Sequence, residues 1–190
     1  MILDPAVSRR KFAREVEIAL SLKHWHQQGI WVMRAEYPVV FVIVVTPSGT
    51  PVFPGVLAAV HIDFTDYDVR PPSVRFVDPF TEKMLGHPEL RWHFPKSKVV
   101  MRHPTTNEPV SVEPVPFVQS FDPARPFICK AGIREYHECS AHSGDAWLLH
   151  RRRKTNLLVE LLTMFQRYGA GACKGINYQI QPIPISAAIE

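Results

Sequence analysis

The segment HIDFTDYDVRPPSVRF, residues 61–76, decides which fold the sequence predicts. It joins the end of one strand-like run, Val56 to Phe64, to the start of another, Ser73 to Val77, through a turn that contains a tyrosine. The two prolines near its end, Pro71 and Pro72, fix φ and remove two backbone donors, which suits a tight crossing between paired strands. The segment therefore predicts two neighbouring strands of an antiparallel sheet.

Upstream of this segment the sequence predicts one helix and two more strands. Apolar residues recur at helical spacing between Pro5 and about Gln28, and Gly29 is typical of a helix end. The runs Ile30 to Tyr37 and Val39 to Val45 are rich in β-branched and large residues, and the second run is apolar enough for a buried central strand. The short connections between consecutive strands favour a four-stranded antiparallel meander.

Downstream, the sequence predicts a long proline-rich insertion at about residues 78–126, which we expect to be ordered and to contain one hairpin. A final helix follows at residues 155–168, with an apolar stripe formed by Leu158, Leu161, Leu162 and Phe165. The expected fold is a single α+β domain over residues 1–190. It has an N-terminal helix, a four-stranded antiparallel meander, a long loop and a C-terminal helix, with helix packed on one face of the sheet.

The composition is typical of a soluble globular chain of ordinary domain size. Of its 190 residues 46% are hydrophobic, and the formal net charge of +4 permits an acidic partner without requiring one. No apolar run approaches the ~20 residues of a membrane-spanning helix. The sequence has no phosphate-binding glycine loop, no interleaved aromatic and basic residues, and no signal-like start. We therefore expect a cytoplasmic protein that binds neither membrane nor nucleic acid.

The pattern Cys129-x5-Glu135-x-His137-x4-His142 has the clearest chemical potential in the chain. A thiolate, two imidazoles and a carboxylate are usual protein ligands of zinc, so the pattern predicts a metal site with Zn²⁺ as the expected ion. Cys139 is an alternative ligand in place of Glu135. Joint ligation by Glu135 and His137 favours an extended segment, because residues two apart lie about 200° apart around a helix.

Two catalytic roles compete with this metal site. A metal-free Cys129 is a candidate nucleophile, whose pKa a neighbouring protonated histidine would lower. Glu135 would instead act as the general base of a zinc-dependent hydrolase, beside a metal-bound water. A zinc-bound thiolate is a poorer nucleophile, so Cys129 serves either the metal or the nucleophilic role. The residues themselves leave these alternatives open.

Residues 61–76 resemble the corresponding region of ubiquitin-conjugating enzymes, whose third strand leads through a tyrosine-containing turn and a Pro-Pro pair into the fourth. In that family the active-site cysteine follows on an irregular segment, and a tryptophan and a helix come after it. Here Cys129, Trp147 and the helix at 155–168 occur in the same order. The resemblance implies the ubiquitin-conjugating fold, with Cys129 at the position of the active-site cysteine.

The sequence departs from that family in two respects. The His-Pro-Asn motif, whose asparagine stabilises the oxyanion, is absent, and only Asp122-Pro123-Ala124 stands nearby. The longer segment from Cys129 to Trp147 holds the Cys/Glu/His/His pattern, which is similar to a predicted bacterial metal-binding family described by the letters CEHH. That family occurs alongside bacterial genes for ubiquitin-like conjugation.

Together the resemblances imply a component of such a pathway, with a zinc site at the usual active-site position. The implied partners are a ubiquitin-like protein and its activating enzyme. Thioester carriage of the ubiquitin-like protein on Cys129 and zinc-dependent hydrolysis with Glu135 as base are the two alternatives.

Overall fold

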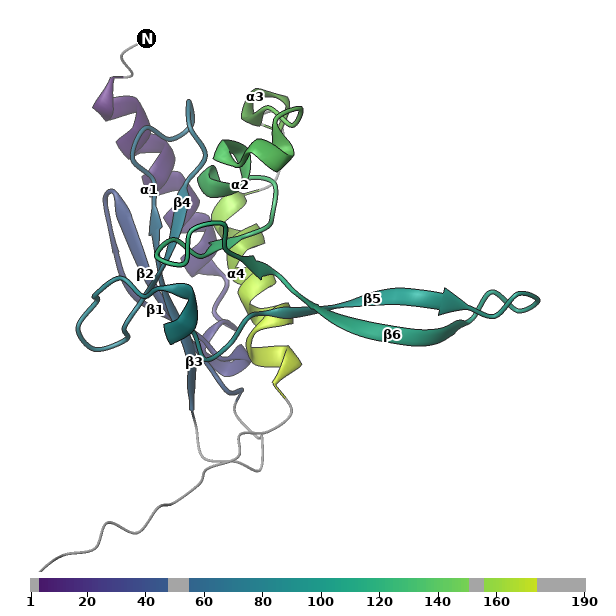
Figure 1. Cartoon of the computed structure of the whole chain (residues 1–190). Helices are drawn as coiled ribbons and strands as arrows, with labels where there is room; N and C mark the ends of the chain where they lie inside the picture. The colour runs from purple at the N-terminus through teal and green to yellow at the C-terminus, as the bar shows by residue number, and fades with distance from the viewer. Residues whose placement is uncertain (1–3, 48–54, 151–155, 174–190) are drawn as a thin grey trace, which may run out of the picture.

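Four strands form an antiparallel sheet at the centre of the structure. The computed structural model describes residues 4–47, 55–150 and 156–173. The strands are hydrogen-bonded in chain order (Figure 1): β1 (Ile30–Glu36), β2 (Val39–Val45), β3 (Val56–Asp63) and β4 (Ser73–Val77). The register sets Val60 of β3 between Val42 of β2 and Phe76 of β4. The predicted meander is confirmed, and the bounds of its strands agree to within one residue.

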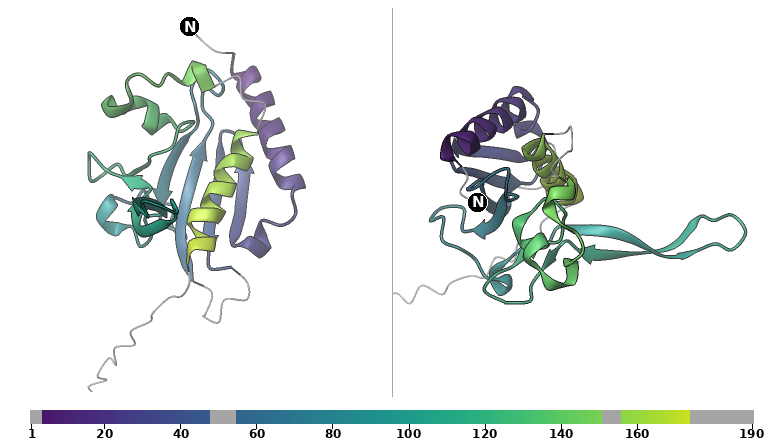
Figure 2. Two further views of the ribbon diagram at one scale, coloured as in Figure 1. Left: turned by 90° about the vertical axis from the view of Figure 1, so that its right-hand side faces the viewer. Right: turned by 90° about the horizontal axis from the view of Figure 1, so that it is seen from above.

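Two helices, α1 (Pro5–Ser21) and α4 (Leu157–Tyr168), cover the same face of this sheet (Figure 2). Asn156 caps α4, because its side-chain oxygen accepts the N–H of Val159 at 2.9 Å. The side chains that α4 buries include the predicted stripe of Leu158, Leu161, Leu162 and Phe165. The core lies between these helices and the sheet, as the amphipathic pattern of the C-terminal helix predicts.

Helix α1 ends at Ser21, so the predicted continuation to about Gln28 is wrong. The backbone of Leu22 is extended, and the indole N–H of the buried Trp25 donates to the carbonyl of Ala19 at 2.7 Å. This contact turns the chain back over the end of the helix. A short 3₁₀ helix, η1 (His26–Gln28), then leads into Gly29, whose φ of +78° favours glycine. Helical spacing alone does not reveal such a turn.

The proline-rich insertion contains a hairpin that projects from the body of the molecule (Figures 1 and 2). Its strands are β5 (Pro95–Arg102) and β6 (Pro109–Pro116), and we call residues 95–116 the arm. None of the arm's strand residues is buried. The 3₁₀ helix η2 (His87–Glu89) precedes the arm, and a small strand pair, β7 (Val118–Gln119) with β8 (Phe127–Ile128), follows it. The predicted hairpin is therefore present.

Short helices occupy the region between β8 and α4: α2 (Arg134–Glu138), the 3₁₀ helix η3 (Ser140–His142) and α3 (Trp147–His150). A last 3₁₀ helix, η4 (Ala170–Ala172), follows α4. Among the residues that the structure describes, no helix is long and apolar enough to cross a membrane.

Candidate functional site

Cys129 follows β8 directly, and the small β7–β8 pair fixes its position. Val118 and Gln119 of β7 pair with Ile128 and Phe127 of β8, and the side chain of Ile128 is fully buried. The N–H of Cys129 then donates to the carbonyl of Phe117 at 2.9 Å. The backbone of Cys129 is thereby fastened to the base of the arm, while its thiol remains half-buried.

His142 is the polar partner of this thiol. Its Nε2 lies 3.6 Å from the Sγ of Cys129, within hydrogen-bonding distance for sulfur. The imidazole is stacked on the ring of Tyr136, with centroids 3.9 Å apart and an interplanar angle of 20°. Tyr136 is itself held by its hydroxyl, which donates to a carboxylate oxygen of Asp145 at 2.9 Å. Stacking therefore orients the imidazole and leaves its Nε2 directed at Cys129.

The surroundings of Cys129 favour the protonated thiol. Burial raises the pKa of this thiol, and the nearby Cys139 adds to the rise, whereas the positive charge of Lys96 opposes it. Lys96 is the second residue of the arm's strand β5, so it is distant in sequence from Cys129. A thiol in this state needs a base to become a nucleophile, and His142 is placed to be that base.

Glu135 faces strand β4, where its carboxylate is held by three groups. The hydroxyl of Ser73 donates to Oε1, the N–H of Val74 donates to Oε2 at 3.1 Å, and the guanidinium of Arg75 lies 3.4 Å from Oε1. The carboxylate is buried, with 9% of the residue exposed. Hydrogen bonds of this kind satisfy a buried charge. Glu135 therefore fastens α2 to the sheet.

His137 is held by the backbone on both sides of its ring. Its Nε2 accepts the N–H of Gly132 at 3.0 Å, and its Nδ1 donates to the carbonyl of Asp145 at 2.6 Å. Gly132 has a φ of +97°, which a residue with a Cβ rarely adopts. The ring thus joins the turn before α2 to the segment that precedes α3.

The helical form of α2 divides the four residues of the predicted metal site. Glu135 and His137 are two apart on this helix, and a helix turns about 200° over two residues. The side chains of Cys129 and His142 are in contact, whereas the carboxylate of Glu135 and the ring of His137 are hydrogen-bonded to other groups. The four side chains therefore do not fit one metal ion in this arrangement. Within the described residues, no three His, Cys, Asp or Glu side chains form a group that could hold a metal. The zinc site, including Cys139 as a ligand, stays a prediction.

The Pro-Pro crossing supports the site through its carbonyl groups. The N–H of Arg134 donates to the carbonyl of Pro72 at 2.9 Å, and its guanidinium donates to the carbonyls of Pro71 and Thr65 at 3.2 and 2.6 Å. Arg134 thus docks α2 onto the segment that decides the fold. Sequence analysis missed this role of Arg134, and nothing in its spacing could have indicated it. The same holds for Tyr136, Asp145 and Lys96, whose partners are defined only by the folded chain.

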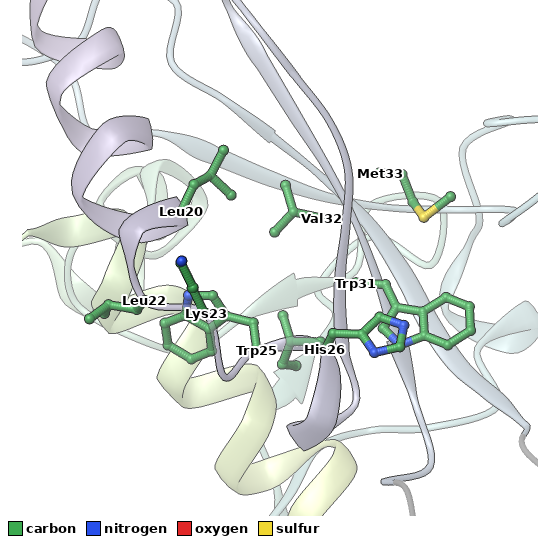
Figure 3. Close-up of a pocket in the computed structure, with 9 residues that line it drawn as sticks. Leu20, Leu22, Lys23, Trp25, His26, Trp31, Val32 and Met33 are labelled. Carbon is green, nitrogen blue, oxygen red and sulfur yellow. The ribbon is translucent and has the colours of Figure 1, made fainter.

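Two surface hollows lie away from Cys129. One, of about 350 Å³, lies between the end of α1 and β1, where His26 stacks on Trp31 (Figure 3). The other, of about 730 Å³, lies beside β3 and β4. Neither hollow is lined by Cys129 or His142. The thiol is therefore not at the bottom of either hollow, whereas small-molecule sites are normally concave.

Comparison with known proteins assigns the chain to a family. The model of the Y4jH-like family, described as the Y4jH family, matches residues 3–173. A relative from Sinorhizobium fredii (strain NBRC 101917 / NGR234), called "Uncharacterized protein y4jH", is 36% identical over 186 residues, which cover 94% of this chain and 90% of the relative. The match to the family includes the arm and the whole segment from Cys129 to His142. This chain belongs to the Y4jH-like family.

Proposed function

We propose that this protein is a conjugating-type enzyme of a bacterial ubiquitin-like pathway, which carries a ubiquitin-like protein as a thioester on Cys129. The observation that carries the proposal is the 3.6 Å contact between the Sγ of Cys129 and the Nε2 of His142. A half-buried thiol beside an oriented imidazole is the pair of groups that nucleophilic cysteine chemistry requires.

The order of elements supports the same proposal. An N-terminal helix, a four-stranded meander, a Pro-Pro crossing, a cysteine on an irregular segment and a C-terminal helix follow one another, as in the ubiquitin-conjugating enzymes that the sequence resembles. Cys129 lines neither of the two hollows, which suits an acyl group presented by another protein. A ubiquitin-like protein joined to its activating enzyme is such a donor.

The proposed step exchanges one thioester for another. His142 accepts the proton of Cys129 as Sγ attacks the thioester carbonyl on the activating enzyme. The bond between that carbonyl carbon and the sulfur of the activating enzyme then breaks, and the departing thiolate takes up the proton. One carbon–sulfur bond forms and one breaks, so the step needs no oxidant or reductant.

A charging assay tests this function. The protein is incubated with ATP and with the activating enzyme and ubiquitin-like protein encoded in the same genome. Wild type is expected to form an adduct that dithiothreitol cleaves, and Cys129→Ser an oxygen ester that resists dithiothreitol. His142→Ala is expected to lower the charging rate at least about 10²-fold, the usual loss on removal of a general base. Cys139→Ser is the matched control and should still charge, because Cys129 and His142 are both intact.

Two results would contradict the proposal. One is that wild type forms no adduct while the activating enzyme is itself charged. The other is that Cys129→Ala still forms the thioester, which would assign the carrier role to Cys139 or Cys173.

A further inference from the structure

The arm exposes apolar side chains that nothing in the described structure covers. Five of its six large aliphatic residues are between 40% and 59% exposed: Val99, Val100, Met101, Val110 and Val112. An isolated two-stranded hairpin is only marginally stable in water. Exposed apolar side chains on such a hairpin indicate a surface that another molecule covers.

The two outer edges of the arm differ in their capacity to pair with a further strand. Strand β6 contains Pro109, Pro114 and Pro116, which have no N–H to donate, and prolines protect an edge from pairing. Strand β5 has a single proline, at its first residue. Residues 96–99 of β5 pair regularly with β6, and bulges begin only after Val99. The open edge is therefore the first half of β5.

The backbone N–H of Ser97 is a hydrogen-bond donor on the open edge of β5. Ser97 stands opposite Pro114 in the register, as Pro95 stands opposite Pro116. Since Pro114 cannot donate to Ser97, this is not a doubly hydrogen-bonded pair, and in the alternation of an antiparallel ladder the N–H of Ser97 points to the outer edge. A carbonyl group of an added strand would accept a hydrogen bond from this N–H.

Charge decides what kind of strand fits. The charged residues of β5 are Lys96, Lys98 and Arg102, all basic, while the one charged residue of β6 is Glu113. A strand added along β5 would meet the basic strand alone. Two copies of β5 side by side would set lysine against arginine, and like charges on neighbouring strands are destabilising. An acidic strand is complementary, and a second copy of this chain is not.

We infer that the arm is a docking surface where an extended, acidic segment of a partner protein adds a third strand along β5. Backbone hydrogen bonds would give the affinity, and the lysines and aliphatic side chains would select acidic and apolar residues at alternate positions. The arm's base touches the candidate nucleophile, because the carbonyl of Phe117, next to β6, accepts the N–H of Cys129. Insofar as the bound protein is the one that reacts at Cys129, the inference rests on the proposed function.

The test uses the full-length Cys129→Ser protein, so that binding is measured without reaction. The probes are fluorescein-labelled peptides of alternating glutamate and valine, or of alternating lysine and valine, followed by fluorescence anisotropy. The glutamate peptide is expected to bind saturably and the lysine peptide not to bind. Lys98→Glu and Ser97→Pro should each weaken binding at least about fivefold, the first by charge and the second by loss of the outward N–H. Ser111→Ala, an exposed position on β6 that keeps every backbone N–H, is the control and should change binding less than about twofold.

Several outcomes would overturn the inference. They are equal binding of both peptides, binding unaffected by Ser97→Pro, and tighter binding of a single-stranded oligonucleotide than of the glutamate peptide. Association of the protein into a dimer that Ser97→Pro abolishes would assign the edge to a second copy. Absence of peptide binding in a protein whose wild type still charges at Cys129 would reject the docking surface and leave the proposed function intact. Peptide binding to a protein whose wild type does not charge at Cys129 would reject the proposed function and leave the docking surface intact.

Discussion

Lys96 supplies a positive charge that favours ionisation of Cys129, against burial and Cys139. Its ammonium group lies 4.6 Å from the centroid of the Phe117 ring, so it is held at the base of the arm beside the backbone partner of Cys129. The raised pKa of Cys129 means that folding favours the protonated thiol. The contribution of the protonated Cys129 thiol to the free energy of unfolding is present below the ordinary pKa of a cysteine. This contribution is lost as the pH rises through the higher pKa of the folded state.

Thiol alkylation measures this balance. At pH 8, Cys129 of the folded protein is expected to react with iodoacetamide more slowly than Cys129 of protein unfolded in urea, because less of it is thiolate. Peptide mass spectrometry separates its alkylation from that of Cys139 and Cys173. Lys96→Ala should slow the reaction of the folded protein further, by about threefold, since loss of the positive charge raises the pKa again. Lys98→Ala, on the same strand, should leave the rate unchanged. A faster reaction of Lys96→Ala would show that Lys96 shields the thiol instead of assisting its ionisation.

At the scale of elements, α2 decides how the candidate site is arranged. The long elements follow from local patterns: β2 is seven residues of Val, Phe and Ile, and α4 has its apolar stripe. The helix over residues 134–138 has no such pattern. Its orientation comes from contacts of Arg134 and Glu135 with Pro71, Pro72 and the start of β4, which are distant in sequence. The sequence therefore predicted the sheet and α4, and grouped Cys129 with His142, but could not predict that Glu135 and His137 would face other partners.

The contacts between Glu135 of α2 and the start of β4 predict that a small substitution there strongly lowers the stability of the fold. Ser73→Ala removes the hydroxyl that donates to Oε1 of Glu135 and leaves the buried carboxylate with fewer donors. We expect a loss of about 1–3 kcal/mol in the free energy of unfolding, measured by urea denaturation. Ser111→Ala on the exposed face of the arm is the control and should lie within about 0.5 kcal/mol of wild type. Equal stability of the two variants would mean that Glu135 does not anchor α2.

The same helix geometry bears on the zinc prediction. The proposed function needs Cys129 free of metal, and the ligand atoms of Glu135 and His137 are engaged in hydrogen bonds. Against the zinc site that the sequence predicts, the proposed function therefore predicts far less than one zinc per chain by elemental analysis of protein purified without chelator. The content should be the same in His137→Ala. About one zinc per chain in wild type, lost in His137→Ala, would restore the four-ligand site and remove Cys129 from the nucleophilic role.

At the scale of the whole molecule, the chain divides into a packed body and an unburied arm. The core of the body is continuous from α1 and α4 to the sheet and includes Ile128 and Ile133 beside the candidate site. No strand residue of β5 or β6 is buried, so the arm contributes little to this core. A feature that exposes apolar side chains without stabilising the fold requires a reason outside the body, and recognition of another protein is such a reason.

Removal of most of the arm tests whether the body folds without it. The variant replaces residues 97–114 with Asn-Gly, a two-residue hairpin turn that the paired residues Lys96 and Val115 then flank, and it keeps the carbonyl of Phe117 beside Cys129. Because the deleted residues are unburied, we expect the free energy of unfolding to change by less than about 1 kcal/mol. The rate of Cys129 alkylation should also be unchanged, whereas binding of the glutamate–valine peptide should be lost. Unfolding of the variant would show that the arm is part of the fold, and retained peptide binding would place the docking surface on the body.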